Sequence, residues 1–221
     1  MTGTGNDIVS LGAINAARTN QYKFYSKILS DSEIPLYNEF NLAVIPFENF
    51  VWLLWSVKES AYKLLQRHEP ALLFTPVKFV VKKLQIPENY AIVKFVANVE
   101  ATGFENNSSI NGLMSFGQHV LYSRSIIYRN LIVSVVSNHD SFENTCWGVK
   151  SIDDPEQENQ SKEVRLFLLN RLKQIYGDFD FRIVKNPHGC PILLKETEET
   201  SIPVSLSHHE NLIGYSFLKH D

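Results

Sequence analysis

The stretch Trp55-Ser56-Val57-Lys58-Glu59-Ser60-Ala61-Tyr62-Lys63 lies inside the clearest helical pattern of the chain, residues 47–68. Pro46 and Pro70 bracket this pattern, as prolines often do at helix boundaries. Apolar side chains recur at the spacing of one helix face: Val57, Ala61, Leu64 and Leu65. The sequence therefore predicts a long helix with a core-facing apolar stripe, and the rest of the chain is interpreted around it.

Glu59 and Lys63 are four residues apart, so they share one face of the predicted helix. An exposed ion pair of modest strength is the simplest interpretation of this spacing. However, Trp52, Trp55 and Ser56 lie on the same face, which is therefore not a plain solvated surface. The arrangement favours a partly covered cleft in which Glu59 binds a metal or takes a proton and Lys63 contacts phosphate.

Asp7 lies inside the predicted short buried strand Gly5-Asn6-Asp7-Ile8-Val9-Ser10-Leu11. A buried carboxylate without a partner is costly, so Asp7 needs a cap, a salt bridge or a metal ion. Carboxylate oxygens are the ligands that Mg²⁺ prefers, and Mg²⁺ keeps free positions for water and phosphate. Taken alone, Asp7 is most simply interpreted as a strand-end cap or a salt-bridge partner, and a magnesium ligand is favoured only when the other segments are considered with it.

Two further segments lie near the end of the chain. Gly189-Cys190-Pro191 has the composition of a turn that leads into a strand. Val204-Ser205-Leu206-Ser207-His208 alternates apolar and polar residues, as a strand does. Zinc binding by His208 and His209 is disfavoured, because adjacent histidines on a strand point apart and no cysteine pair assists them. The chain also lacks the Gly-x-Ser-x-Gly elbow of a serine hydrolase.

In this order, the four segments resemble those of 4'-phosphopantetheinyl transferases. These enzymes move the phosphopantetheine arm of coenzyme A onto a serine of a carrier protein. The resemblance covers roughly residues 5–80 and 160–218. At the front it is similar to the acyl-carrier-protein-synthase type, including the segment from Lys27 to Glu33. The chain has the length of the surfactin type but the segment order of the shorter synthase type.

The resemblance implies an α+β fold of two pseudo-symmetric halves, in which antiparallel sheets pack against long helices. We expect the halves to span residues 1–139 and 140–221, with an acidic linker at residues 153–161 and coenzyme A in the cleft between them. Weak internal repeats agree with this interpretation. Lys162-Glu163 repeats Lys58-Glu59, and Lys150 falls at the place of Asp7.

The resemblance also implies roles for individual residues. Asp7 and Glu59 would bind Mg²⁺, and Glu59 and Lys63 would act in catalysis. Cys190 replaces the lysine that surfactin-type enzymes usually have, so another cation would have to supply the missing charge. The residues that would bind coenzyme A, including the candidates for that charge, are Lys162, Arg165, Lys185, Gly189, Pro191, Ser207 and His208.

The partners follow from the same resemblance: coenzyme A and an apo acyl or peptidyl carrier protein, whose acidic helix would meet Arg18, Lys23 and Lys27. The carrier's pathway, whether fatty acid, polyketide or peptide synthesis, stays open. We expect a monomer, because the second half carries the elements that a synthase-type half takes from its neighbour. Two alternatives remain: a catalytically silent carrier-binding protein and a magnesium-dependent diphosphate hydrolase.

Composition limits the class of protein. A formal charge of -3 argues against a nucleic-acid binder, and 44% hydrophobic with 20% charged residues is typical of a soluble globular protein. Two cysteines cannot build a disulfide framework, which suits a reducing compartment. The longest apolar run, residues 50–55, is too short to span a membrane, and Asp7 disfavours a signal peptide. We therefore expect a cytoplasmic protein without membrane contact.

The remaining pattern predicts secondary structure between these segments. Residues 20–42 have helical spacing, and a second amphipathic helix spans about 161–176 before Gly177. Three strands are expected to follow that helix. Runs rich in β-branched and aromatic residues predict further strands at residues 77–84, 90–101, 112–122 and 126–137.

Overall fold

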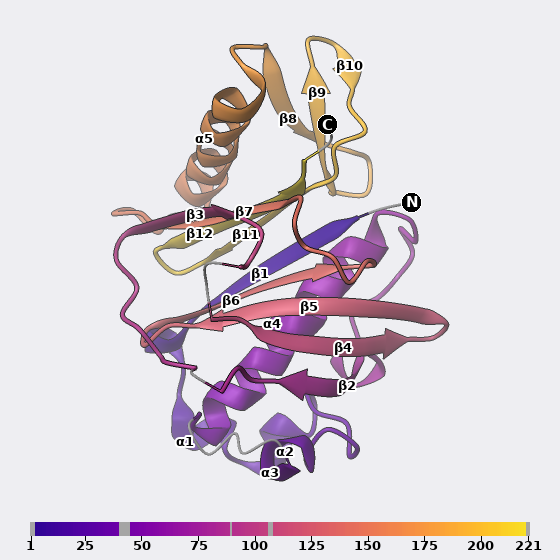
Figure 1. Ribbon diagram of the computed structural model, residues 1–221, viewed down its shortest axis with the longest axis vertical. Helices are drawn as coiled ribbons and strands as arrows, with labels where there is room; N and C mark the ends of the chain where they lie inside the picture. The colour runs from indigo at the N-terminus through magenta and orange to yellow at the C-terminus, as the bar shows by residue number, and fades with distance from the viewer. Residues whose placement is uncertain (1–2, 40–44, 89, 106–107, 220–221) are drawn as a thin grey trace.

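Helix α4 (Phe47–Gln66) forms where the sequence predicts the longest helix. The structure, a computed structural model, describes residues 3–39, 45–88, 90–105 and 108–219 (Figure 1). Val57 and Ala61 are fully buried, and Leu64 and Leu65 are almost so. Both the helix and its core-facing stripe are therefore confirmed.

Five antiparallel strands form the sheet on which α4 packs (Figure 1). Hydrogen bonds join them in the order β1-β6-β5-β4-β2. The register of β1 against β6 places Asp7 opposite Ser134. The strands are β1 (Thr4–Ser10), β2 (Val80–Gln85), β4 (Ile110–Phe116), β5 (His119–Ile127) and β6 (Leu131–Ser137).

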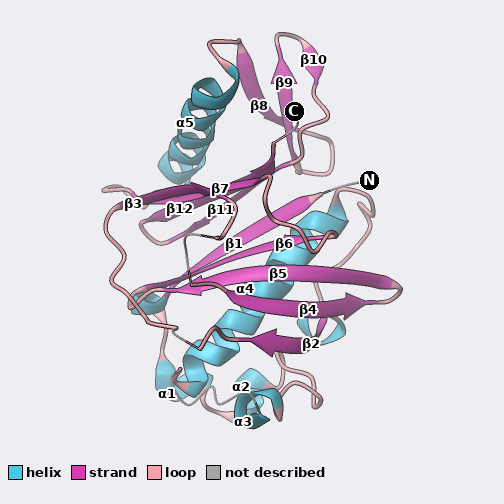
Figure 2. Ribbon diagram, in the orientation of Figure 1, coloured by secondary structure: helices cyan, strands magenta, loops and turns pink. Residues whose placement is uncertain are grey.

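A second antiparallel sheet has the order β11-β12-β7-β3, and a small third sheet has the order β10-β9-β8. Helix α5 (Gln157–Tyr176) packs against the second sheet and lies beside the third (Figure 2). The strands are β3 (Asn98–Thr102), β7 (Thr145–Ser151), β8 (Phe181–Lys185), β9 (Pro191–Lys195), β10 (Glu198–Glu199), β11 (Val204–His209) and β12 (Leu212–Leu218).

The two larger sheets pack against each other, with one long helix on each outer face (Figure 2). Ile8 and Val133 of the first sheet share a buried cluster with Trp147, Val149 and Leu212 of the second. Alternate residues of the same strands face the helices instead, because successive side chains of a strand point to opposite sides. The layers are therefore α4, first sheet, second sheet and α5, and β1 is buried along its full length.

Three strands of each larger sheet share one order. In the first, β1 precedes the 20-residue helix α4 and pairs with β6, which pairs with β5. In the second, β7 precedes the 20-residue helix α5 and pairs with β12, which pairs with β11. Strand β3, although it lies early in the chain, adds to the second sheet beside β7. The predicted α+β class with antiparallel sheets is confirmed.

The predicted linker at residues 153–161 is wrong. Helix α5 begins at Gln157, so only residues 152–156 connect it to β7, and both elements belong to the second sheet and its helix. Glu158 lies in the first turn of α5, where a negative charge interacts favourably with the helix dipole. The acidic composition that suggested a linker is thus partly that of a helix N-terminus.

Several other boundaries differ from the prediction. Residues 20–42 were expected to be helical, but only short helices form nearby, and residues 40–42 lie outside the described part of the chain. These short helices are α1 (Ala16–Thr19), α2 (Tyr22–Tyr25) and α3 (Leu36–Glu39). The run 112–122 is a hairpin that turns at Gly117 with φ of 55°, and the run 90–101 enters a strand only at Asn98. Five strands, not three, follow α5.

No helix in the described ranges is long and apolar enough to cross a membrane. The surface helices α1, α2 and α3 are each only four residues long.

Lys58, adjacent to Glu59 on α4, is fully buried rather than exposed. Its Nζ donates to Glu33 Oε2 and to the carbonyl oxygen of Ile28, each at 2.6 Å. Glu33 also accepts from the backbone N–H of Ser30 and of Val81, both at 2.7 Å. Burial lowers the pKa of Lys58, although Glu33 opposes this shift. This ion pair ties the segment after α2 and strand β2 to α4.

Removing Lys58 should leave the Glu33 carboxylate buried without its counter-charge. We therefore expect Lys58→Met to reduce the free energy of unfolding by about 3–5 kcal/mol, measured by urea denaturation. Lys83→Met is the matched control, because Lys83 is exposed on β2 and should change stability by less than about 0.5 kcal/mol. Equal stability of the two variants would show that the buried pair contributes nothing to the fold.

Candidate functional site

The close approach of β1 to α4 brings the candidate site together. A Cβ on Gly5 would lie 2.0 Å from the carbonyl oxygen of Ser60, so only glycine permits this contact. Asp7, two residues further along the strand, points to the same side as Gly5. Its carboxylate therefore meets the face of α4 that carries Glu59 and Lys63.

Lys63 lies between two carboxylates at this contact. Its Nζ is 3.0 Å from Asp7 Oδ1, 3.3 Å from Glu59 Oε1 and 3.2 Å from the carbonyl oxygen of Asn6. The Asp7 side chain is 7% exposed, whereas the Glu59 and Lys63 side chains are 28% and 24% exposed. The structure thus brings all three predicted residues together: the Asp7 side chain is buried, and the Glu59 and Lys63 side chains are partly exposed to solvent.

The charges at this contact shift one another. Burial raises the pKa of Asp7 to about 7; Lys63 opposes the rise and Glu59 adds to it. Desolvation lowers the pKa of Lys63, but Asp7 and Glu59 outweigh it, and the net direction is upward. The second oxygen of Asp7, Oδ2, is buried and has no hydrogen bond of ordinary geometry, although the nearby Ser56 hydroxyl, itself buried and unpartnered, lowers the pKa of Asp7 slightly. An orphaned carboxylate oxygen beside a second carboxylate is suited to binding a cation.

The two sheets meet along β1 through side chains of β11 and β12. Asn6 donates its backbone N–H to Ser205 Oγ at 3.0 Å and its Nδ2 to Ser207 Oγ at 2.7 Å. The backbone N–H of Ser10 donates to His209 Nδ1 at 3.0 Å. We call these contacts the seam. It fixes the position of β11 relative to Lys63, because Lys63 also donates to Asn6.

Ser207 and His208 therefore have different positions. Ser207 is buried in the seam, where its hydroxyl accepts the Asn6 amide, so its predicted contact with phosphate is not open to that side chain. His208 is exposed and lies on the opposite side of β11. Partial burial lowers the pKa of His208, and the positive charges of Lys63 and Lys185 lower it further. The negative charge of Glu59 opposes this shift.

The turn at Gly189-Cys190-Pro191 is built as the sequence predicts. Gly189 has φ of 83°, a conformation that favours glycine, and Asn186 Oδ1 accepts the N–H groups of His188 and Cys190. The turn contacts α4: Arg67 Nη1 donates to the carbonyl oxygen of Pro191 at 3.2 Å. The cations beside this turn therefore include Lys185, which is opposite Pro191 in the register of β8 and β9, and Arg67, which the sequence interpretation did not include.

Lys162 and Arg165 are placed differently. They lie in the N-terminal part of α5, where Arg165 Nη1 donates to the hydroxyl and the carbonyl oxygen of Ser161. No contact in the described ranges joins either residue to Lys63 or to the turn. The neighbouring Glu163 pairs with Lys150 at 3.6 Å. Glu163 corresponds to Glu59 and Lys150 to Asp7, so the second sheet and its helix have one acid and one base where the first have two acids.

Trp52 and Trp55 do not line an open cleft beside Glu59. They contact each other, and Phe24 and Phe74 cover them from either side. The indole N–H of Trp52 donates to Thr19 Oγ1 at 3.1 Å. The tryptophans therefore attach α1, α2 and residue 74 to α4.

Within the described ranges, no cluster of three or more His, Cys, Asp or Glu side chains is arranged to hold a metal. A site at Asp7 and Glu59 would have two protein carboxylates only. Comparisons with protein families, with curated proteins and with solved structures gave no match. The interpretation of the site therefore rests on its own geometry and on the sequence pattern.

Asn6 and Arg67 are the site residues that sequence reasoning missed. Asn6 is a polar residue beside Asp7 in a buried strand, which is a signal that it bonds across an interface. Arg67 follows Lys63 by four residues, so it continues the same helix face. Both patterns are visible in the sequence, but neither one identifies the residue that Asn6 or Arg67 contacts.

The buried carboxyl of Asp7 should make stability depend on pH. Because its pKa rises from 3.8 to about 7 on folding, the folded chain binds the proton more tightly, and stability falls as the pH rises through this window. In metal-free buffer we expect Asp7→Asn to raise the free energy of unfolding more at pH 8 than at pH 5, by at least about 1 kcal/mol. Chemical denaturation at the two pH values measures this.

Glu59→Gln is the matched control, because it removes the more exposed carboxylate at the same contact and should change stability less. A loss of stability in Asp7→Asn at both pH values would mean that the Asp7–Lys63 pair is a structural ion pair and not a strained binding site.

Proposed function

We propose that this protein transfers the 4'-phosphopantetheine group of coenzyme A to a serine of an apo carrier protein. The observation that carries the proposal is the meeting of Asp7, Glu59 and Lys63 at the β1–α4 contact, with the orphaned Asp7 oxygen beside them. These are the residues to which the sequence resemblance gives metal binding and catalysis.

The strand order supports the same proposal. The transferase resemblance implies two related halves, and β1-β6-β5 with α4 has the same connections as β7-β12-β11 with α5. The site residues on β1 and α4 belong to the first of these units and His208 belongs to the second, while Lys185 lies on β8 of the third sheet. We therefore propose residues 1–139 and 140–221 as the two halves, although β3 crosses from the first to the second sheet.

Each side chain has a role in the proposed reaction. The carrier serine oxygen forms a bond to the β-phosphorus of coenzyme A, and the bond to the bridging oxygen breaks, so 3',5'-ADP leaves. Glu59, which is open to solvent, takes the serine proton. Lys63 donates to the phosphoryl oxygens, and His208 with Lys185 faces the nucleotide phosphates. Reactions of this type depend mainly on positioning and charge neutralisation.

Magnesium fits the two carboxylates. Asp7 and Glu59 offer oxygen ligands, one of them buried and unpartnered, which is the chemistry Mg²⁺ prefers. When bound there, Mg²⁺ would neutralise the charge of the diphosphate. The Lys63 ammonium contacts both carboxylates and keeps them close together, which supports the proposal that it also meets phosphate.

The transfer itself is the first test. Incubation with coenzyme A, Mg²⁺ and a panel of apo carrier proteins should add one phosphopantetheine to a carrier serine, detected by mass spectrometry. Asp7→Ala and Glu59→Ala should each lower turnover by at least about 10²-fold, because each removes charge stabilisation in the transition state.

Glu163→Ala is the matched control, since Glu163 has the corresponding place on α5 but pairs with Lys150 and should leave turnover unchanged. Release of 3',5'-ADP with no modified carrier would indicate a diphosphate hydrolase. Carrier binding without either product would indicate a silent carrier-binding protein. Either result rejects the proposed transfer.

Lys63 should act in the transition state more than in binding. We expect Lys63→Ala to lower kcat by about 10²-fold or more while coenzyme A affinity changes by only a few fold. Lys63→Arg should recover only part of the rate, because a planar guanidinium differs from an ammonium in shape and reach. Steady-state kinetics together with binding of coenzyme A measure the two effects. A loss in affinity alone would reduce Lys63 to a binding residue.

A further inference from the structure

A cavity of about 440 Å³ lies beyond the C-terminal end of α4, against the turn before β9 and the segment before β11. Its walls include Ile192, Ile202 and Pro203, which are apolar, and Thr200 and Ser201, which carry hydroxyls. Arg67 lies in the same lining. His68 and Glu199 also line the cavity, which is therefore a mixed pocket with an apolar surface, one guanidinium and one carboxylate.

Arg67 is an unusual residue for such a position. In the described ranges its side chain has a single hydrogen bond, to the carbonyl oxygen of Pro191, and it forms no ion pair. Its Nε is buried without a partner. Burial lowers the pKa of Arg67, and Cys190 and Glu199 oppose the shift. A mostly buried guanidinium with unused donors is costly unless an anion completes it.

The position of Arg67 connects the pocket to the candidate site. Arg67 follows Lys63 by one helical turn, so both side chains extend from the same face of α4. Its contact with Pro191 also places the guanidinium on the turn where Cys190 stands. The lysine of surfactin-type enzymes is absent from this turn. Of the other candidate cations, Lys185 lies opposite Pro191 in the register of β8 and β9, but in the described ranges Arg67 is the one whose side chain donates to the turn.

We propose that Arg67 is a specificity-determining residue that binds the phosphorylated adenosine end of coenzyme A, supplying from α4 the charge that the turn lacks. The inference deepens the proposed transfer and rests on it for the identity of the ligand. The apolar walls at Ile192, Ile202 and Pro203 suit the face of a nucleobase. The guanidinium suits a phosphate, which it can bind through two parallel hydrogen bonds.

Binding of 3',5'-ADP, measured by isothermal titration calorimetry on the full chain, tests this inference without turnover. Arg67→Gln should weaken binding at least about tenfold, the effect of losing one or two charged hydrogen bonds. Arg67→Lys should weaken it less. Adenosine, which carries no phosphate, should bind weakly and equally to the wild type and to Arg67→Gln.

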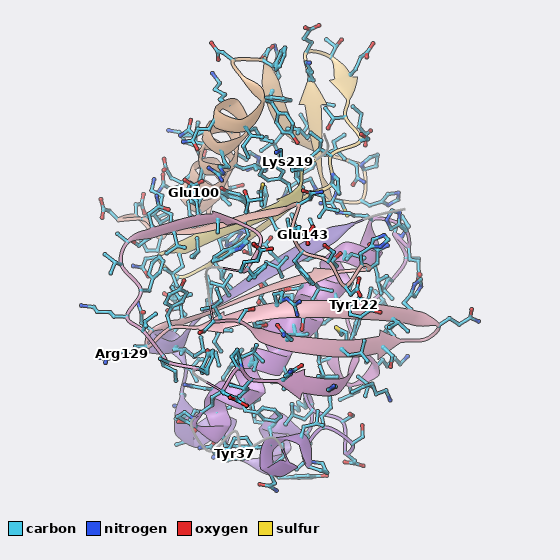
Figure 3. All side chains as sticks on the ribbon, in the orientation of Figure 1. Tyr37, Glu100, Tyr122, Arg129, Glu143 and Lys219 are labelled. Atoms are coloured by element: carbon cyan, nitrogen blue, oxygen red, sulfur yellow. The ribbon has the colours of Figure 1, made fainter. Side chains whose placement is uncertain are left out.

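Two further variants keep the test decisive. Arg129→Gln is the matched control, because Arg129 is exposed at the turn between β5 and β6 (Figure 3) and should leave binding unchanged. Ser201→Glu places a negative charge at an exposed position of the pocket, so it should also weaken 3',5'-ADP binding even if Arg67→Gln does not fold. Thermal melting curves show which variants are folded.

The outcomes separate this inference from the proposed function. Transfer to a carrier with unchanged 3',5'-ADP affinity in both Arg67→Gln and Ser201→Glu would overturn the role of Arg67 alone. Failure of the wild type to bind 3',5'-ADP would also overturn it. Binding of 3',5'-ADP that depends on Arg67, without any transfer to a carrier, would support the pocket and reject the transferase.

Discussion

The contacts of Asn6 join the parts of this protein on which the candidate site depends. Its carbonyl oxygen accepts the Lys63 ammonium of α4, while its N–H and its amide donate to Ser205 and Ser207 of β11. One residue of β1 therefore fixes the helix that carries the charges and the strand that carries His208. Gly5 permits the same strand to approach α4 closely. If β1 moved, the two halves of the site would separate.

Neighbouring residues of α4 serve opposite purposes. Lys58 is fully buried, and its ammonium pairs with the Glu33 carboxylate and donates to a carbonyl oxygen, so it stabilises the fold. Glu59 and Lys63 remain partly open, and the buried Asp7 oxygen beside them has no partner. A group that is costly in the isolated protein is commonly found where a ligand completes it. This difference is the physical reason to place function at Asp7 and structure at Lys58.

The sequence predicted α4 and its apolar stripe because periodicity is a local property, whereas the meeting of Asp7 with Glu59 and Lys63 was expected only from the transferase resemblance. The sequence did not predict the burial of Lys58, whose partner Glu33 lies 25 residues away. The serines of β11 were expected to face one side of a strand, but their partner on β1 is about 200 residues distant. The segment 153–161 was wrongly predicted to be a linker, because both helix N-termini and linkers are often rich in acidic residues.

The central claim is that one chain completes one site, with Asp7 on one side of the seam and His208 on the other. The most direct measurement mixes Asp7→Ala chains with His208→Ala chains, assays transfer, and determines the molar mass by light scattering. We expect monomers and no recovery of activity, because neither chain can lend its intact residue to the other. Recovered activity in a stable trimer would contradict the claim and would show that the site forms between subunits.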